Sequence, residues 1–317
     1  MKKRITILMF VITAFVAGSV VSTVTAQEHI MFMPHWKAQA QFAGYYVAKE
    51  NGFYQEEGLE VDIVHPKTTQ SMLDIVQSNT SQVVVMSLFQ ALEACKKGWP
   101  VVNILQTSMN TATMIVARKD KFPLQKGARV GTWFYFDALT QGISHREQLD
   151  YEWVPMTSSV SMFIRGGIDA MIAMSYNEYY QLLQTGVELP EEAIFRMSEH
   201  GYNVQEEGVY MPRDYYISHK QQAEKFAKAS RRGWEWAAEH PKETLDIVMR
   251  YVHKDKVGTN RVLQQLMLQE ILRLQIDKQS GQREFRLRPD MVKLANELIT
   301  EAGVEGKEVT YEQLIGQ

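Results

Sequence analysis

Short apolar runs alternate with helix-like stretches along the chain, and this pattern occurs twice. In the first half, residues 29–33, 59–64, 83–86 and 101–106 are apolar or alternating, as strands are. Helix-like stretches lie between them, at 39–51, 69–78 and 88–97, and Gly52 stands where a helix would end. Alternation at these intervals predicts an α/β fold with mostly parallel strands.

The pattern restarts after an extended run at 111–120. Strand-like segments follow at 128–133, 152–156 and 169–174, with helices expected at 159–167 and 176–185. A second extended run covers 206–219, and residues 220–302 are helix-like, with Pro241 at a helix start. We therefore expect two lobes with a cleft between them: lobe one from 27–118 and 209–317, and lobe two from 119–208.

The N-terminus is typical of an exported protein. Lys2, Lys3 and Arg4 precede an apolar run, and Val24-Thr25-Ala26 offers small residues for cleavage, so residues 1–26 are expected to be a signal peptide. The only cysteine, Cys95, is not at the cleavage point, so no lipid anchor is expected. We expect a periplasmic protein, a monomer, whose fold is held by its core without an internal disulfide.

Charge and motifs exclude several functions. The formal net charge is −3 and no dense basic stripe occurs, which argues against nucleic acid as a partner. The chain has no Gly-x-Ser-x-Gly, Walker loop, Gly-x-Gly-x-x-Gly or His-Glu-x-x-His. The eight histidines stand singly. We expect no catalytic residue, no metal and no cofactor.

Three segments stand where a strand ends and a helix begins, the place at which α/β sheets leave crevices for ligands. The first holds Trp36, Gln39 and Gln41, although the following Phe42 and Tyr46 are more simply explained as core residues. In the second, residues 131–137, four aromatics in succession cannot all face one core, and Trp133 is expected in the cleft; a contact between lobes would also explain it.

The third segment presents Tyr176, Asn177 and Glu178 at a helix start, where a glutamate also suits the helix dipole without any ligand. Together the three segments favour a flat, hydrogen-bonding heterocycle, held between rings and contacted by a carboxylate. A sulfonate or nitrate would instead require arginine or helix N–H groups. The main basic candidate, Arg165, is late in its helix, where it would face solvent.

The stretch "HWKAQAQFAGYYVAKENGFYQEEGLEVDI" is similar to the opening of the thiamine-pyrimidine-precursor branch of the type II periplasmic binding proteins. "GARVGTW", "GGIDAMIAMSYNEYYQL" and "EEGVY" resemble that family in the expected order, so the resemblance spans about residues 30–215. It implies a type II periplasmic binding fold: two Rossmann-like lobes, a hinge of two extended crossings and C-terminal helices on the first lobe.

The resemblance also implies a function. Such proteins close on a solute and deliver it to the permease of an ABC importer. In relatives that bind formylaminopyrimidine or hydroxymethylpyrimidine, aromatics stack on the ring and an acid contacts its amine. These roles would fall on Trp36, Trp133, Tyr176 and Glu178, and Ser87 is also expected at the site.

Other functions remain open. Sulfonate, nitrate and riboflavin-precursor binders share the scaffold, so the solute could instead be a sulfonate, a riboflavin precursor or an aromatic compound. A periplasmic sensor would have the same sequence features. The family also includes a synthase that makes the pyrimidine from its own histidine and a pyridoxal phosphate held on a lysine. Those two residues would fall here at Met86 and Gln90, which cannot perform that chemistry. A Cys-rich loop of the synthase is also missing from residues 131–137. The sequence therefore favours a binding protein over an enzyme.

Overall fold

The computed structural model describes residues 27–66, 71–133, 137–157 and 159–317. The expected signal peptide, residues 1–26, lies outside these ranges. In the part of the chain that is described, no helix combines the length and the apolar character needed to cross a membrane.

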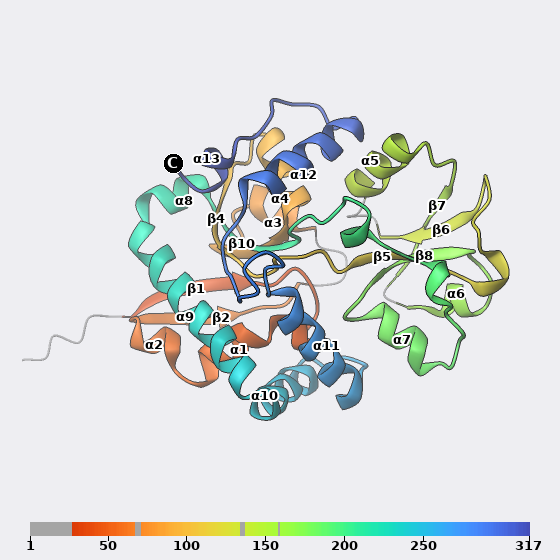
Figure 1. The fold of residues 1–317 in the computed structure, drawn as a ribbon. Helices are drawn as coiled ribbons and strands as arrows, with labels where there is room; N and C mark the ends of the chain where they lie inside the picture. Colours follow the sequence, from red (N-terminus) through yellow and green to blue (C-terminus); the bar gives the residue numbers. More distant parts are fainter. Residues whose placement is uncertain (1–26, 67–70, 134–136, 158) are drawn as a thin grey trace, which may run out of the picture.

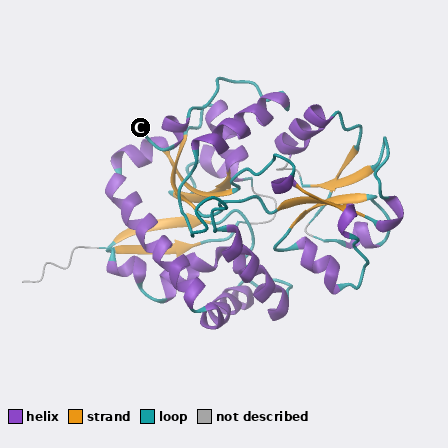
Figure 2. Ribbon diagram, viewed as in Figure 1, coloured by secondary structure: helices purple, strands orange, loops and turns teal. Residues whose placement is uncertain are grey.

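The chain forms two five-stranded sheets side by side, each covered by helices (Figures 1 and 2). The first sheet has the order β2-β1-β3-β10-β4. Its strands are β1 (Glu28–Met33), β2 (Leu59–Ile63), β3 (Val83–Ser87), β4 (Val101–Gln106) and β10 (Glu207–Pro212). Strands β1, β2 and β3 are parallel, whereas β10 runs antiparallel to both β3 and β4.

The second sheet repeats this arrangement in the order β7-β6-β8-β5-β9. Its strands are β5 (Thr113–Ala117), β6 (Arg129–Thr132), β7 (Glu152–Pro155), β8 (Ala170–Met174) and β9 (Ile194–Arg196). Here β5 is the antiparallel strand, between β8 and β9. In each sheet, therefore, the antiparallel strand is the one that directly follows a connection from the other sheet in the chain. The expected mostly parallel α/β architecture is confirmed, with one reversed strand per sheet.

We use lobe one for the first sheet with its helices, and lobe two for the second. The expected boundaries differ from the sheets at two points. Strand β5 was expected in lobe one but pairs in the second sheet, and β10 begins two residues before the expected return at 209. We therefore propose that the chain changes lobes at 107–112 and again at 200–206.

Helices fill the connections between strands. Those of the N-terminal half are α1 (Ala43–Glu50), α2 (Phe53–Glu56), α3 (Met72–Gln77), α4 (Leu88–Lys96), α5 (Asp137–Glu147), α6 (Ser161–Ile164) and α7 (Glu178–Gln184). The later ones are α8 (Arg213–Ser218), α9 (Lys220–Glu239), α10 (Pro241–Lys254), α11 (Arg261–Leu274), α12 (Pro289–Glu301) and α13 (Tyr311–Leu314). Single 3₁₀ turns are η1 (Ala40–Phe42), η2 (Lys119–Lys121), η4 (Glu191–Ala193) and η5 (Met197–Glu199).

Two local expectations were wrong. The run 206–219 was expected to be extended throughout, but only β10 is a strand and 213–218 form α8, because Pro212 ends the strand and provides the helix cap. The region 220–302 was expected to be helical, but residues 275–288 form a non-helical segment with a bridge between Ile276 and Arg283. Pro241 does begin a helix, as expected.

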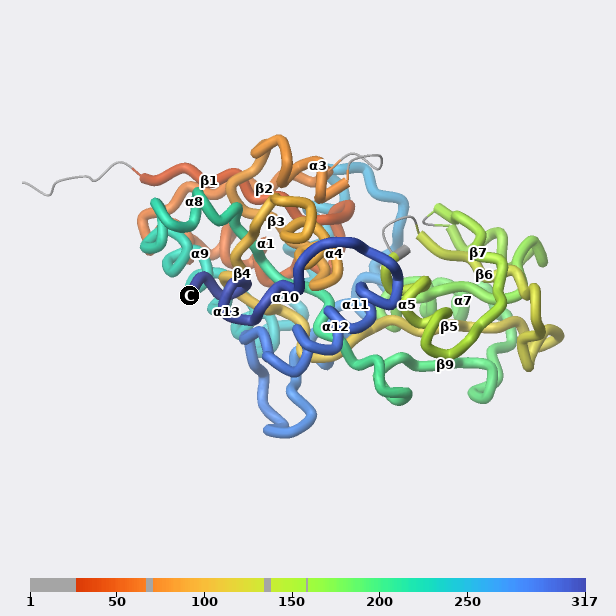
Figure 3. Tube along the Cα trace, turned by 90° about the horizontal axis from the view of Figure 1, so that it is seen from above, coloured from red at the N-terminus to blue at the C-terminus, as the bar shows by residue number. Residues whose placement is uncertain are grey.

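The C-terminal helix α12 joins the lobes. It packs on α4 of lobe one and on α5 of lobe two, and the two helices α5 and α12 lie side by side in both views (Figures 1 and 3). Their contact is close: a Cβ added to Gly142 of α5 would come within 2.4 Å of the Leu298 carbonyl oxygen. Arg146 of α5 also donates two charge-assisted hydrogen bonds to Glu301 of α12, at 2.9 and 2.6 Å.

Candidate functional site

A cavity lies between the two sheets, at the ends of β1, β3 and β8 and at the start of β10. Its space is about 720 Å³, including the part open to solvent. Both lobes contribute to its wall, which is lined by His35, Ser87, Phe89, Gln90, Thr111, Leu139, Met174, Tyr176, Met197, Tyr202, Val204, Glu206 and Glu207. The described lining includes two carboxylic acids and no lysine or arginine. Because a buried anion needs a cation or several N–H donors, this wall favours an uncharged or cationic ligand.

The lobe-one wall includes the start of α4. The Ser87 hydroxyl accepts a hydrogen bond from Gln90 N at 3.2 Å, and the Gln90 side chain accepts one from Ser87 N at 3.2 Å. This capping box fixes both side chains at the N-terminus of α4. Gln90 therefore presents an amide to the cavity, whereas Met86, one residue before Ser87, is fully buried in a lobe-one core cluster.

A chain of hydrogen bonds crosses from lobe one to lobe two. The Gln39 amide donates to Gln41 Oε1, and Gln41 Nε2 donates both to the Tyr176 hydroxyl, at 2.9 Å, and to Glu207 Oε1. The Tyr176 hydroxyl lies 3.5 Å from the same Glu207 oxygen and donates to it. Of these residues Tyr176 alone comes from lobe two, so the network exists only while the lobes are together.

His35 completes the network. Its Nε2 is 3.3 Å from Gln41 Nε2, whose two hydrogens are already donated to Tyr176 and Glu207. Its other ring nitrogen, Nδ1, is buried without a hydrogen-bond partner among the residues described. Burial, and secondarily the nearby His65, lowers the pKa of His35 to about 4, so the ring is neutral at pH 7.

Glu206 holds the two crossings together. One carboxylate oxygen accepts from the hydroxyls of Thr111 and Thr113, and the other accepts from Ala112 N at 2.9 Å. Burial still raises the pKa of Glu206, against the opposing effect of these hydrogen bonds. Glu206 is therefore a hinge residue whose oxygens are satisfied by the opposite crossing.

Glu207 has a different environment. Burial, and secondarily the neighbouring Glu206, raises the pKa of Glu207 to about 8, although the Gln41 hydrogen bond acts in the opposite direction. The carboxyl is therefore mostly protonated at pH 7. In the described part of the chain its hydrogen bonds all involve Oε1, and the residue lines the cavity.

Glu178 and Asn177 turn toward their own lobe. The Glu178 carboxylate accepts from Met174 N at 3.1 Å and from Asn177 Nδ2 at 2.6 Å, and its side chain is 3% exposed. Burial raises the pKa of Glu178 to about 7, against these hydrogen bonds and the charge of Lys37. Neither residue is part of the described cavity wall. They fix the turn that carries Tyr176.

The two expected tryptophans also lie outside the described wall of the cavity. Trp36 is half-buried against the main core, and its carbonyl oxygen accepts from His65 Nδ1 at 2.5 Å. Trp133, directly after β6, is 3% exposed and packs within that core. The other aromatics of its run, 134–136, lie outside the described residues.

Of the expected site residues, Ser87 and Tyr176 line the described cavity, and Gln39 and Gln41 are connected to it through the hydrogen bonds of Gln41 to Tyr176 and Glu207. Sequence reasoning did not single out His35, Gln90, Glu206 or Glu207 as binding residues. A signal for the last two was present: two consecutive acids immediately before a buried apolar strand are costly unless they have partners. Within the described ranges no group of three or more His, Cys, Asp or Glu side chains has the spacing of a metal site.

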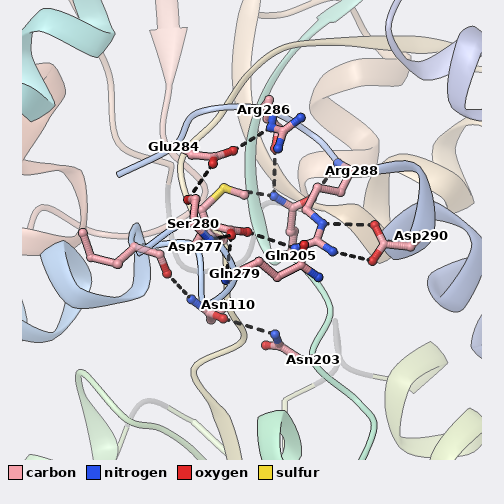
Figure 4. Close-up of polar contacts among 12 residues, drawn as sticks. Asn110, Asn203, Gln205, Asp277, Gln279, Ser280, Glu284, Arg286, Arg288 and Asp290 are labelled. Carbon is pink, nitrogen blue, oxygen red and sulfur yellow. Dashed lines mark hydrogen bonds and ion pairs between the residues drawn. The ribbon is translucent and has the colours of Figure 1, made fainter. Parts of the chain in front are cut away.

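A non-helical segment between α11 and α12 covers both crossings on the side shown in Figure 4. Asn110 of the first crossing donates to the Ile276 carbonyl at 2.8 Å and accepts from Asn203 of the second crossing at 3.1 Å. Gln205 donates to the Arg286 carbonyl and accepts from Arg288 N, at 2.9 and 2.8 Å. We call residues 275–288 the hinge strap.

An ion pair fixes the hinge strap itself. Arg288 donates to Asp277 at 2.9 Å and to Asp290 at 2.7 Å, and Asp277 also accepts from the backbone of Gln279 and Ser280 (Figure 4). These backbone hydrogen bonds, more than the Arg288 charge, lower the pKa of Asp277. The hinge strap is therefore held by its own hydrogen bonds and ion pairs as well as by its contacts with the two crossings.

Solved structures with a similar fold include periplasmic proteins that bind sulphonate and nitrate. The aliphatic sulphonate binding protein SsuA from Escherichia coli superposes with a TM-score of 0.64 over 92% of each chain, at 14% identity. A nitrate-binding protein from Synechocystis superposes with a TM-score of 0.57 over 87% of this chain and 80% of that one, also at 14% identity. These likenesses show the type II periplasmic binding fold.

Sequence relatives divide between binding proteins and synthases. A formylaminopyrimidine-binding protein from Halalkalibacterium halodurans is 24% identical over 71% of each chain. A 4-amino-5-hydroxymethyl-2-methylpyrimidine phosphate synthase from Candida albicans is 24% identical over 68% of each chain. The family description "NMT1/THI5 like" matches residues 39–244, a range that holds both crossings and most of the cavity wall. The chain belongs to the NMT1/THI5-like family of type II periplasmic binding folds.

Proposed function

We propose that this protein is the periplasmic substrate-binding component of an ABC importer and that it binds a thiamine-type pyrimidine precursor between its lobes. The observation that carries the proposal is the chemistry of the cavity wall: two protonatable acids, amides and a tyrosine, from both lobes, with no lysine or arginine in its described part. A neutral heterocycle with ring nitrogens fits such a wall.

The same wall weighs against the anionic ligands of the fold's other members. A sulfonate or nitrate in this cavity would face Glu206 and Glu207 without a compensating cation in the described lining. Two carboxyls with raised pKa values would have to stay protonated beside it. The formylaminopyrimidine-binding relative supports the pyrimidine instead.

A binding function is also supported against a synthase function. Met86 is buried in the core and Gln90 presents only an amide to the cavity, so the two positions that match the synthase residues offer neither an amine nor an imidazole. We propose that the protein acts as a monomer, exported through residues 1–26, and that its closed form is recognised by a permease in the inner membrane.

Closure explains why the site spans both lobes. A ligand shifts an open–closed equilibrium only as far as it binds the closed state better, so contacts from both sides are required. Tyr176 from lobe two and Gln41 and Glu207 from lobe one supply them. Trp36, next to His35, remains our candidate for stacking on the ring.

A ligand panel tests the proposal. Thermal shifts and calorimetric titrations would compare 4-amino-5-hydroxymethyl-2-methylpyrimidine, formylaminopyrimidine, riboflavin, an alkanesulfonate and nitrate. A ligand at 100 times its dissociation constant adds about 2.7 kcal/mol to the free energy of unfolding, which a thermal shift detects. A response to the pyrimidines alone is expected. A response to sulfonate alone would replace this function by the binding of a sulfonate.

The synthase alternative has its own measurement. Pyridoxal phosphate is added, and the visible spectrum is recorded before and after borohydride. We expect no reducible Schiff base. A borohydride-stable adduct on a lysine of the cavity would restore the enzymatic interpretation.

A further inference from the structure

Glu207 combines three properties that no other described residue of the cavity wall shares. It begins β10, directly after the second crossing, so its position is fixed by the backbone pairing of Glu207 with Ser87. Its Oε1 accepts hydrogen bonds from Gln41 and from Tyr176, one on each lobe. Its other oxygen has no hydrogen-bond partner among the residues described.

These contacts decide where the proton of a neutral carboxyl stands. Because Oε1 is the acceptor for two donors, the carbonyl character is on Oε1 and the hydroxyl is Oε2–H. No lysine or arginine in the described wall stabilises the ionised form, and the neighbouring Glu206 opposes it. The side chain therefore offers the cavity a hydrogen-bond donor, where an ionised carboxylate would only accept.

From this geometry, and resting on the proposed function, we propose that Glu207 is a specificity-determining residue: its protonated carboxyl donates a hydrogen bond to a ring nitrogen of the pyrimidine. Gln41 and Tyr176 act as positioning residues, because they hold Oε1 and so orient Oε2–H. Since Tyr176 reaches Glu207 only across the cleft, the donor is oriented only in the closed form.

The other acid expected to contact the ligand, Glu178, already accepts hydrogen bonds from its own lobe. Both of its oxygens accept hydrogen bonds within its own turn, from Met174 N and Asn177 Nδ2, and it is not part of the described wall. To contact a ligand, Glu178 would have to break these hydrogen bonds. Glu207 could contact a ligand through Oε2 without breaking its hydrogen bonds to Gln41 and Tyr176.

Proton-linked binding follows. The pyrimidine is a weak base and is uncharged above about pH 7.5, so the complex holds one proton, on Glu207. Above the pKa of about 8, Glu207 is ionised in the ligand-free protein, so it must take up a proton when the ligand binds. Affinity should then fall by up to about tenfold per pH unit.

The titratable groups around Glu207 are the preceding Glu206, Tyr45 on α1 and Tyr176 after β8, and His35 lines the same cavity. Burial lowers the pKa of His35 to about 4 and raises that of Tyr45 well above its ordinary value, so neither changes charge between pH 7.5 and pH 9.5. Glu206 is the remaining titratable carboxyl, and its oxygens are held by Thr111, Ala112 and Thr113.

The experiment measures the dissociation constant of 4-amino-5-hydroxymethyl-2-methylpyrimidine by calorimetry from about pH 7.5 to about pH 9.5. Four proteins are compared with the wild type: Glu207→Gln, Glu207→Leu, Glu178→Gln and Glu60→Gln. The glutamine at 207 keeps an N–H donor that cannot ionise, whereas leucine has none. Glu60, exposed on β2, receives the same chemical change away from the site.

We expect the wild type, Glu178→Gln and Glu60→Gln to lose affinity together above about pH 8. Glu207→Gln should bind within about fivefold of the wild type at the lowest pH and remain flat to the highest. Glu207→Leu should bind at least about tenfold more weakly at every pH. Circular dichroism checks that each variant is folded. If Glu207→Leu does not fold, the pH dependence of binding by Glu207→Gln decides the question.

Two results overturn the inference. If Glu207→Gln keeps the wild-type fall in affinity, the linked proton is not on Glu207, while the proposed function stands. If Glu178→Gln alone abolishes the loss of affinity with rising pH, Glu178 is the acid that contacts the pyrimidine ring. Absence of any pyrimidine binding by the wild type would instead overturn the proposed function, and this inference with it.

Discussion

Gln41 Nε2 donates a hydrogen bond to the Tyr176 hydroxyl at 2.9 Å, although the two residues belong to different lobes. Gln41 is in the 3₁₀ turn before α1, and Tyr176 is in the turn between β8 and α7. The contact bridges the two lobes, so a separation of the lobes would break it. It connects the amide of one lobe to a hydroxyl of the other, and Tyr176 lines the cavity between them.

Removing the hydroxyl tests this contact. Tyr176→Phe should weaken pyrimidine binding by about 1 kcal/mol, roughly fivefold in the dissociation constant, because a neutral hydrogen bond available only to the closed form is lost. Calorimetry measures it. Tyr180→Phe, the same change on α7 outside the cavity wall, serves as the control, and equal affinities of both variants would contradict the role of Tyr176.

Stability should depend on pH through Glu207. Its pKa rises from 4.5 to about 8 on folding, so the folded state binds more protons and the free energy of unfolding falls as the pH rises between these values. His35, with its lowered pKa, acts in the opposite sense below pH 6.5. The effect of Glu207 on stability is therefore measured between pH 6.5 and 8, where His35 does not oppose it.

In that window Glu207→Gln should gain in melting temperature relative to the ligand-free wild type as the pH rises. Differential scanning fluorimetry at several pH values measures the difference. The exposed Glu60→Gln should follow the wild type. A constant offset between Glu207→Gln and the wild type across the window would show that Glu207 has an ordinary pKa.

The contact between α1 and α9 leaves no room for a methyl group. A Cβ on Gly233 of α9 would lie 2.0 Å from the Gly44 carbonyl oxygen of α1. Gly233→Ala should therefore destabilise the protein by about 1–3 kcal/mol or more, because the helices must move apart. Chemical denaturation gives the value. Gly258→Ala, where the added carbon meets nothing, is the control, and a loss there of the same size would point to another cause.

The stacking role proposed for Trp36 is separable from its packing role. Trp36→Ala should weaken pyrimidine binding by about tenfold if the ring stacks on the ligand, with only a small change in melting temperature, because the side chain is half-buried. Trp99→Ala changes another half-buried tryptophan in lobe one, distant in the chain, and should leave affinity unchanged. Wild-type affinity in Trp36→Ala would remove this residue from the site.

Much of the fold could be predicted from local patterns. Residues 101–106 were expected to be a strand and form β4, and the turn at Gly52 has a φ of +75°, which suits glycine. The order of strands in the sheets could not be derived this way. The reversed strands β5 and β10 look like any other apolar run, and only the pairing of distant segments shows that each enters the sheet of its own lobe antiparallel.

The candidate site was harder to predict for the same reason. Gln41 and Tyr176 lie just before the starts of α1 and α7, which local signals identify. Glu207 belongs to an extended run, and nothing local distinguishes a hinge acid from a ligand-facing acid. Glu206 and Glu207 point to different partners, the first to Thr111 and Thr113 and the second to Gln41, and adjacent residues of an extended chain do so because successive side chains alternate in direction.

The placement of β10 has a consequence for how the chain folds. Strands β3 and β4 are not neighbours in the first sheet, since each is hydrogen bonded to β10, which arrives about a hundred residues later. Until residues 207–212 are available, both strands expose unpaired edges, and loop closure over such a distance is slow. The first sheet is thus completed only by a strand that follows lobe two in the chain, and a fragment that ends before residue 207 lacks the strand that connects β3 to β4.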